Sequence, residues 1–305
     1  MPIPYHERAP RRRRQATATS VEGDGPGHRA LAAGGRLGYI TLNRPEKLNA
    51  LSRPIKAPAV IFFFPCSARQ ARAATRRCAG WWSSAGKASA APSRRLRPAP
   101  DAEGRTGEGD AVDDRDRLQD NIDRWLRVWD FPKPVIAQVH GYCLAGATQL
   151  CVMTDLTIVA EDARIGLPSL PVGGGYISPM WTWLVGPKRA KEMSFIPGSQ
   201  IDGRTASDWG FANRAVPAAR LADEVRQTAE AIAVVPEKIL RLKKMSINRT
   251  MDAQGFRVAV SYGVETDALL HASEPVRAIS GSIRRLGLRG AIEQFRAGGA
   301  DESAG

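Results

Sequence analysis

A central stretch of the sequence limits what this chain can fold into. Between Cys66 and Arg105, Ala, Arg, Ser and Pro make up 27 of 40 positions, and Leu96 is the only Leu, Ile, Val, Met or Phe. A segment with so little large aliphatic surface cannot offset the conformational entropy lost when its backbone is ordered. The core of the 305-residue chain must therefore come from what precedes and follows this stretch.

Regular hydrophobic patterns occur on both sides of it. Residues 36–43 alternate like a half-buried strand and run into the turn-forming Pro45. Further strands are predicted over 135–139 and 156–160, with a glycine turn and an apolar helix between them. One helix face is expected at Leu118, Ile122, Trp125, Leu126 and Trp129, before Pro132 and Pro134.

Helical signals dominate the second half of the chain. Helices are predicted over 187–195, 221–233, 237–251 and 254–270, with a further one opened by Asp202 or Thr205. Strands thus come first and helices last, with βα units between them. This order predicts a layered α/β core followed by a helical subdomain.

Composition and local patterns argue against membrane and secreted classes. The chain is 43% hydrophobic and 25% charged, as globular proteins are. Its longest apolar candidate, Val60 to Phe64, falls far short of the roughly 20 residues of a membrane span. The Arg-rich start has no apolar stretch after it, and Glu7 argues against a transit peptide. The sequence therefore predicts a cytoplasmic protein without a membrane partner.

Cysteine spacing argues against a metal site. Cys66, Cys78, Cys143 and Cys151 form no CxxC pair and have no histidine at a metal-ligand spacing. We expect no metal, and we interpret Cys143 and Cys151 as small core residues.

The net charge of +13 raises the possibility of a nucleic-acid partner. Residues 1–30 carry +3 and residues 66–105 carry +7, so these two stretches hold +10 of the total. Neither has the interleaved aromatics or helical period of an element that reads a groove. Non-specific contact with polyanions stays open, but no specific nucleic-acid partner is predicted.

Five segments, taken in order, resemble one known family. They are GYITLNRPEKLNALS (38–52), KPVIAQVHGYCLAGATQL (133–150), DLTIVAEDARIGLP (155–168), LVGPKRAKEM (184–193) and DGRTASDWGFANRAVP (202–217). In this order they resemble the enoyl-CoA hydratase/isomerase (crotonase) family and cover most of residues 36–250. Ordered agreement over five segments is stronger evidence than any single motif.

The resemblance implies a fold and a division of the chain. It implies an α/β protein with a crotonase-like spiral core of ββα units and a C-terminal helical subdomain. We expect a disordered basic tail over 1–34, the core over 35–218 with a poorly ordered anomalous part at 55–111, a helical oligomerisation region over 219–297, and a disordered tail over 298–305. It also implies a homotrimer or a dimer of trimers, with the C-terminal helices between subunits.

The chemistry implied by the resemblance is stabilisation of an enolate formed from an acyl-CoA thioester. Coenzyme A would enter as part of the substrate, and no other cofactor is expected. One oxyanion donor would be the backbone N–H of Gly146. Independently of the family, a glycine turn that opens a helix presents free N–H groups and the positive end of the helix dipole.

The sequence departs from the family at both catalytic acids. Family hydratases use two glutamates, whose positions are occupied here by Gln149 and Ser169. Neither an amide nor a hydroxyl without a base can activate water, although both can position a ligand by hydrogen bonding. We interpret His140, Asp155 and Asp162 as structural.

The remaining site assignments concern substrate contacts. The resemblance gives Leu48 and Ala50 as the lip for coenzyme A, with turn formation as the equal alternative. Tyr142, Gly174 and Tyr176 are the other expected contacts, because the glycines at 173–175 suggest a helix entrance that lines the acyl pocket. Trp181 and Trp183 fit either a pocket wall or the core.

The stretch from about 54 to 110 lacks the family's helix, core strand and second oxyanion loop. Regrouping the codons for Trp81 to Ala91 one nucleotide earlier permits Val-Val-Glu-Phe-Gly-Gly-Gln-Gly-Phe-Cys-Ser, which looks like that missing loop. The sequence therefore predicts a frameshifted segment near residues 54–110. The predicted function is binding of an acyl-CoA thioester and stabilisation of its enolate. The alternative is a non-catalytic acyl-CoA-binding or interaction protein.

Overall fold

The structure is a computed structural model that describes residues 110–175 and 177–298. It also describes the backbone of four strands at 19–22, 28–32, 37–42 and 60–65. Of Ile177 and Ser178, only the backbone is described.

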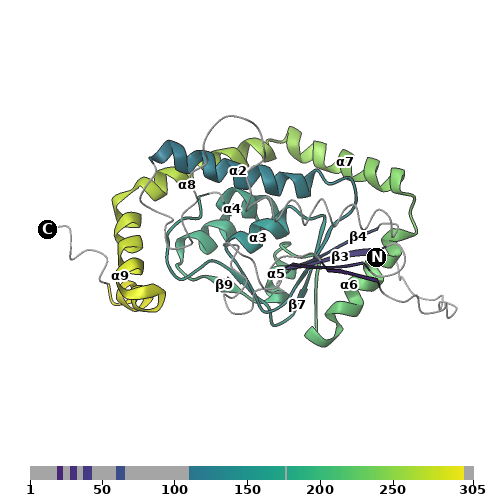
Figure 1. The fold of residues 1–305 in the computed structure, drawn as a ribbon, viewed down its shortest axis with the longest axis horizontal. Helices are drawn as coiled ribbons and strands as arrows, with labels where there is room; N and C mark the ends of the chain where they lie inside the picture. The colour runs from purple at the N-terminus through teal and green to yellow at the C-terminus, as the bar shows by residue number, and fades with distance from the viewer. Residues whose placement is uncertain are drawn as a thin grey trace.

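The described strands form two sheets, and helices cover them (Figure 1). The larger sheet has the order β1-β2-β3-β4-β5-β7-β10; the smaller has the order β6-β8-β9. In the larger sheet, β1 to β5 pair antiparallel, whereas β5, β7 and β10 pair parallel. The strands are β1 (Thr19–Glu22), β2 (His28–Ala32), β3 (Leu37–Leu42), β4 (Val60–Pro65), β5 (Ile136–Val139), β6 (Tyr142–Leu144), β7 (Leu156–Ala160), β8 (Arg164–Gly166), β9 (Gln200–Ile201) and β10 (Arg214–Val216). The predicted α/β class is confirmed.

Three strands lie where the sequence predicts disorder or an anomaly. β1 and β2 fall within the tail 1–34, and β4 falls within the anomalous part 55–111. β1 pairs antiparallel with β2, and β2 and β4 each pair antiparallel with β3, so the backbone groups of these strands have partners. The rest of both stretches up to residue 109, including the segment 66–105, lies outside the described residues.

The helices cover the sheet and extend beyond it. They are α2 (Ala111–Trp129), α3 (Gly146–Val152), α4 (Ile177–Phe195), α5 (Gly203–Asp208), α6 (Ala218–Ala233), α7 (Glu237–Ala253), α8 (Phe256–Ala272) and α9 (Glu274–Arg296). In Figure 1, α7, α8 and α9 form a band along the top and left, with α2 beside α8. Helix α6, which also falls in the region 219–297, lies apart from this band and contacts the strands of the larger sheet.

Helix α2 buries the apolar face that the sequence predicts. Leu118, Ile122 and Trp129 are buried in it, and Trp125 and Leu126 are partly buried against the same core. Trp129 stacks on Phe256 of α8 with ring centroids 4.5 Å apart. Aromatic packing therefore joins two helices that are far apart in sequence.

Helix boundaries follow local chemistry. The dihedral angles of Gly186 (φ 79°, ψ 165°) break α4, so a new helical segment starts at Pro187 as the sequence predicts. Asp202 caps α5 by accepting the backbone N–H of Thr205 at 2.8 Å. Gly255, in the left-handed region, separates α7 from α8.

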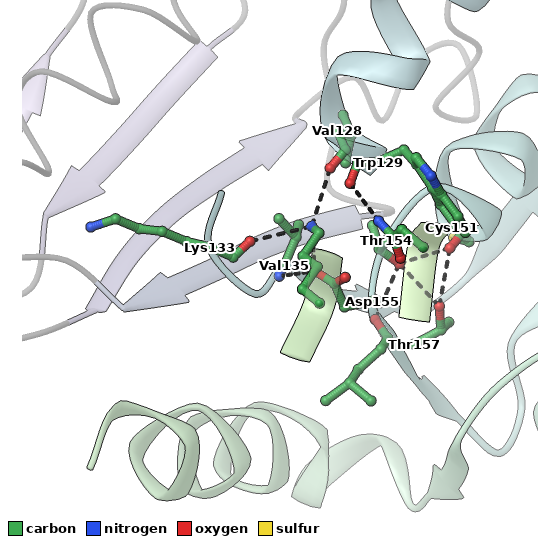
Figure 2. Close-up of polar contacts among 11 residues, drawn as sticks. Val128, Trp129, Lys133, Val135, Cys151, Thr154, Asp155 and Thr157 are labelled. Atoms are coloured by element: carbon green, nitrogen blue, oxygen red, sulfur yellow. Dashed lines mark hydrogen bonds and ion pairs between the residues drawn. The ribbon is translucent and has the colours of Figure 1, made fainter. Parts of the chain in front are cut away.

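A buried ion pair attaches α7 to the sheet. Figure 2 shows its carboxylate partner, Asp155, next to Val135. The side chain of Lys244 is 8% exposed, and its Nζ lies 2.8 Å from Asp155 Oδ2. The same carboxylate oxygen accepts the backbone N–H of Val135, directly before β5, at 2.7 Å. Burial lowers the pKa of Lys244 and raises the pKa of Asp155, and the attraction between the two charges opposes both shifts. The predicted structural role of Asp155 is confirmed.

Candidate active site

The candidate site is built around the turn between β6 and α3. β6 pairs parallel with β8, with Leu144 opposite Gly166, and the N–H of Ala145 donates to the carbonyl of Gly166 at 2.9 Å. The chain continues from Gly166 to Ser169, three residues later. Pairing of the two short strands thus brings the glycine turn beside the strand that leads to Ser169.

Ala145 has an unusual backbone conformation. Its φ of 50° and ψ of −122° make it the one residue other than glycine with positive φ among those described. Such a conformation costs about 1–3 kcal/mol and persists only where the surrounding structure fixes it. It orients the chain so that the helix begins directly at Gly146.

Gly146 is the first residue of α3, as the sequence predicts. Its N–H makes no hydrogen bond within the described part of the chain, as expected for the first turn of a helix. Every later residue of α3 is buried. A free donor at the positive end of a buried helix is suited to stabilise negative charge on a ligand.

Two side chains fix the start of α3 from within. The hydroxyl of Thr148 donates to the carbonyl of Ala145 at 2.8 Å. The indole N–H of Trp181, on α4, donates to the same hydroxyl at 3.1 Å. Trp181 is buried and stacks on Phe211, and Trp183 packs edge-on against Phe256. Of the two predicted roles for these tryptophans, the structure supports the core.

Gln149 lies on the first turn of α3 with its side chain 1% exposed. Its Oε1 has no hydrogen-bond partner among the described residues. A buried polar atom without a partner is uncommon and unfavourable by about 1–3 kcal/mol. The arrangement suits a ligand that donates a hydrogen bond.

Ser169 is half-buried beside Gly198, and a Cβ added to Gly198 would lie 3.4 Å from the Ser169 hydroxyl oxygen. The Gly198 N–H donates to the carbonyl of Pro168 at 3.0 Å, so the two loops are joined next to Ser169. Neither Gln149 nor Ser169 carries an ionisable group, so neither position supplies a general base.

The other residues expected to contact the substrate do not gather at the turn between β6 and α3 in the described part of the chain. Tyr142 is 43% exposed at the start of β6. The N–H of Gly174 donates to Asp267 at 2.8 Å, so this donor is already used within the protein. Leu48, Ala50 and Tyr176 lie outside the described residues.

The sequence analysis missed a group of ionisable residues on α2 and α8. His271 donates from Nδ1 to Asp114 Oδ2 at 2.6 Å, and Asp267 lies one turn before it on α8. The i, i+4 spacing of Asp267 and His271 was visible in the sequence. Asp114 is 157 positions from His271, and no local pattern links the two.

The buried cysteines confirm their predicted core role. Cys143 and Cys151 bracket the turn, and their sulfur atoms lie 3.8 Å apart. The contact with Cys143, together with burial, raises the pKa of Cys151 well above its usual range, so the thiol stays protonated. In the part of the chain that the structure describes, no group of three His, Cys, Asp or Glu residues could hold a metal ion.

Comparison with known proteins identifies the family of this chain. The family model described as enoyl-CoA hydratase/isomerase matches residues 101–264, beginning near the end of the segment 54–110. The chain belongs to the enoyl-CoA hydratase/isomerase family. A Mycobacterium tuberculosis protein provisionally named enoyl-CoA hydratase EchA13 is 32% identical over 78% of each chain.

Solved structures of family members agree with the fold. An enoyl-CoA hydratase/isomerase from Xanthobacter autotrophicus is 29% identical with a TM-score of 0.65, covering 87% of this chain and 98% of that one. A structure from Novosphingobium aromaticivorans, provisionally assigned as an enoyl-CoA hydratase/isomerase, is 44% identical with a TM-score of 0.59. That match covers 61% of this chain and 68% of the other. None of the helices described here is long and apolar enough to cross a membrane.

Proposed function

We propose that this member of the enoyl-CoA hydratase/isomerase family binds an acyl-CoA thioester and stabilises its enolate without a glutamate general base. The observation that carries the proposal is the N–H of Gly146, which has no partner among the described residues and lies at the start of a buried helix. When the carbon next to the thioester carbonyl loses a proton to water, the electron pair of the broken C–H bond moves to the thioester oxygen. A donor directed at that oxygen stabilises the enolate more than the ground state.

Gln149 is then a ligand-positioning residue. Its Oε1, which has no partner among the described residues, supports a hydrogen bond from a hydroxyl of the acyl group or from a bound water. A site with a buried acceptor discriminates strongly against ligands that lack the matching donor. We propose the same positioning role for Ser169, and coenzyme A is needed only as part of the substrate.

We further propose that the protein works as a homotrimer or a dimer of trimers. The C-terminal helices carry many exposed large apolar residues, which favours contact with other subunits. Those exposed by more than half of their surface are Leu242, Ile247, Val258, Tyr262, Leu269, Leu286 and Leu288.

The second candidate is a non-catalytic acyl-CoA-binding protein. The lack of ionisable groups at 149 and 169 favours it specifically. Both candidates predict binding, but only the first predicts turnover.

The test combines calorimetric titration with a turnover panel. We expect saturable binding of butyryl-CoA, with much weaker binding of butyryl-pantetheine, and turnover of at least one enoyl-, hydroxyacyl- or dienoyl-CoA. Binding without any turnover would favour the non-catalytic candidate. Absence of butyryl-CoA binding by the folded protein would contradict both.

A further inference from the structure

The glycine loop, defined as Gly173 to Gly175, is held by residues of α8. Asp267 Oδ1 accepts the N–H of Gly174 and the N–H of Gly175, each at 2.8 Å. Asp267 itself is only 3% exposed. A buried carboxylate that accepts two backbone N–H groups is a strong and specific anchor.

Glycine is required for this close contact. A Cβ on Gly175 would lie 2.6 Å from the backbone nitrogen of Asp267. A Cβ on Gly173 would lie 3.0 Å from His271 Nε2 and 3.3 Å from Asp267 Oδ1. The loop therefore rests directly on the face of α8 that carries Asp267 and His271.

His271 lies between two carboxylates. Its Nδ1 donates a hydrogen bond to the Asp114 carboxylate, which also forms an ion pair with Arg117. The second carboxylate, Asp267, lies one turn away on α8. The charged groups that act on the imidazole are thus Asp114 and Arg117 from α2 and Asp267 from α8. The three glycines of the loop carry no ionisable side chain.

The charges of the group depend on one another. Burial alone would lower the pKa of His271, but the hydrogen bond to Asp114 and the charge of Asp267 outweigh it and raise the pKa above 6.5. Burial raises the pKa of Asp267 despite the two backbone hydrogen bonds. A protonated His271 therefore balances two carboxylates that would otherwise repel each other.

The loop also connects to the candidate active site. The loop leads into α4, where the indole N–H of Trp181 donates to the hydroxyl of Thr148. That hydroxyl donates to the carbonyl of Ala145 in the turn between β6 and α3. A displacement of the loop would move the start of α4 relative to α3. Misplacing a catalytic donor by about 1 Å can cost roughly 10²-fold in rate.

We propose that Asp267 and His271 are positioning residues: Asp267 anchors the glycine loop, and protonated His271, held by Asp114, keeps that anchor in place. The link from the loop to catalysis rests on the proposed function; the anchoring does not. Because the folded-state pKa of His271 is raised, its stabilising charge is fully present below about pH 6.5 and is lost as the pH rises through the raised value.

The experiment measures amide hydrogen exchange at Gly174 and Gly175 as a function of pH, corrected for the intrinsic rate, in the full-length protein. NMR titration of the His271 ring is recorded in parallel. We expect protection to fall about tenfold, the equivalent of one pK unit, as His271 loses its proton. This fall in protection is called the pH step below. In Asp114→Asn the midpoint of the pH step moves to lower pH, and in His271→Gln the pH step disappears.

Asp130→Asn is the matched control, because it removes a different ion pair between α2 and α8, with Arg257, and leaves the glycine loop untouched. It should keep the wild-type pH step. The proposal is overturned if wild-type protection does not change across the His271 titration, or if the pH step survives in His271→Gln. If His271→Gln does not fold, an unshifted midpoint in Asp114→Asn overturns it equally. Failure of butyryl-CoA binding at every pH, with the pH step intact, would contradict the proposed function alone.

Discussion

At the scale of single residues, the site combines features that the sequence reveals with features that it hides. A glycine turn before an apolar helix was sufficient to place Gly146 at the first position of α3. The positive φ of Ala145 was not predictable, because alanine rarely adopts it and the contacts around it, the β6–β8 pairing and the Thr148 hydroxyl, come from the fold. The pairing of His271 with Asp114 was hidden for a similar reason, since it depends on how α2 packs on α8.

The residue-scale prediction concerns the two positions that lack glutamate. In a gene restored in frame across codons 55–111, Gln149→Glu combined with Ser169→Glu should raise hydration of crotonyl-CoA. A positioned general base contributes about 10²- to 10⁴-fold. The measurement is loss of enoyl-thioester absorbance, with Gln149→Ala combined with Ser169→Ala as the control. Robust hydration by the chain as it stands would contradict the argument from the missing glutamates.

At the scale of elements, most helices and the inner strands were predictable because their periodicity is local. β7 and the helical segment from Pro187 lie where the pattern placed them. β4 was missed, because an apolar run beside a low-aliphatic stretch gives no sign of its partners β3 and β5. The contact of α7 with the residue that precedes β7, through Lys244 and Asp155, was also hidden, since a lysine on a helix usually faces solvent.

The element-scale prediction tests this contact. Lys244→Met should destabilise the protein by about 3–5 kcal/mol, because it leaves the Asp155 carboxylate buried without its partner. Lys244→Met combined with Asp155→Asn should recover most of that loss, since asparagine can still accept the Val135 N–H. Urea unfolding monitored by circular dichroism measures both. Equal stability of wild type and Lys244→Met would refute the role assigned to the ion pair.

At the scale of the whole molecule, the family and the α/β class were readable from five ordered segments, because each combines several constrained positions. The division into regions, the oligomeric state and the frameshift stay predictions, as they depend on residues 66–109 or on other subunits. Restoring the frame should return a soluble trimer or dimer of trimers with tighter butyryl-CoA binding. Light scattering after gel filtration, with calorimetry, measures this. An original chain that already matches the restored one in both respects would contradict the frameshift account.

The central claim is that Gly146 donates its N–H to the oxygen of a thioester enolate. Acetoacetyl-CoA tests it directly, because its enolate absorbs in the near ultraviolet and forms without a base from the protein. Proline has no N–H, so Gly146→Pro removes the donor, whereas Gly146→Ala keeps it. Because proline also restricts the backbone of Ala145, the comparison needs Gly146→Pro protein that folds and binds.

The measurement is the pH at which bound acetoacetyl-CoA becomes half enolate, compared with the free thioester. We predict that the protein and Gly146→Ala lower this pH, and that Gly146→Pro, folded and still binding, shifts it back by about two to three units, the equivalent of 10²- to 10³-fold. An equal enolate fraction in Gly146→Pro and wild type would contradict the account.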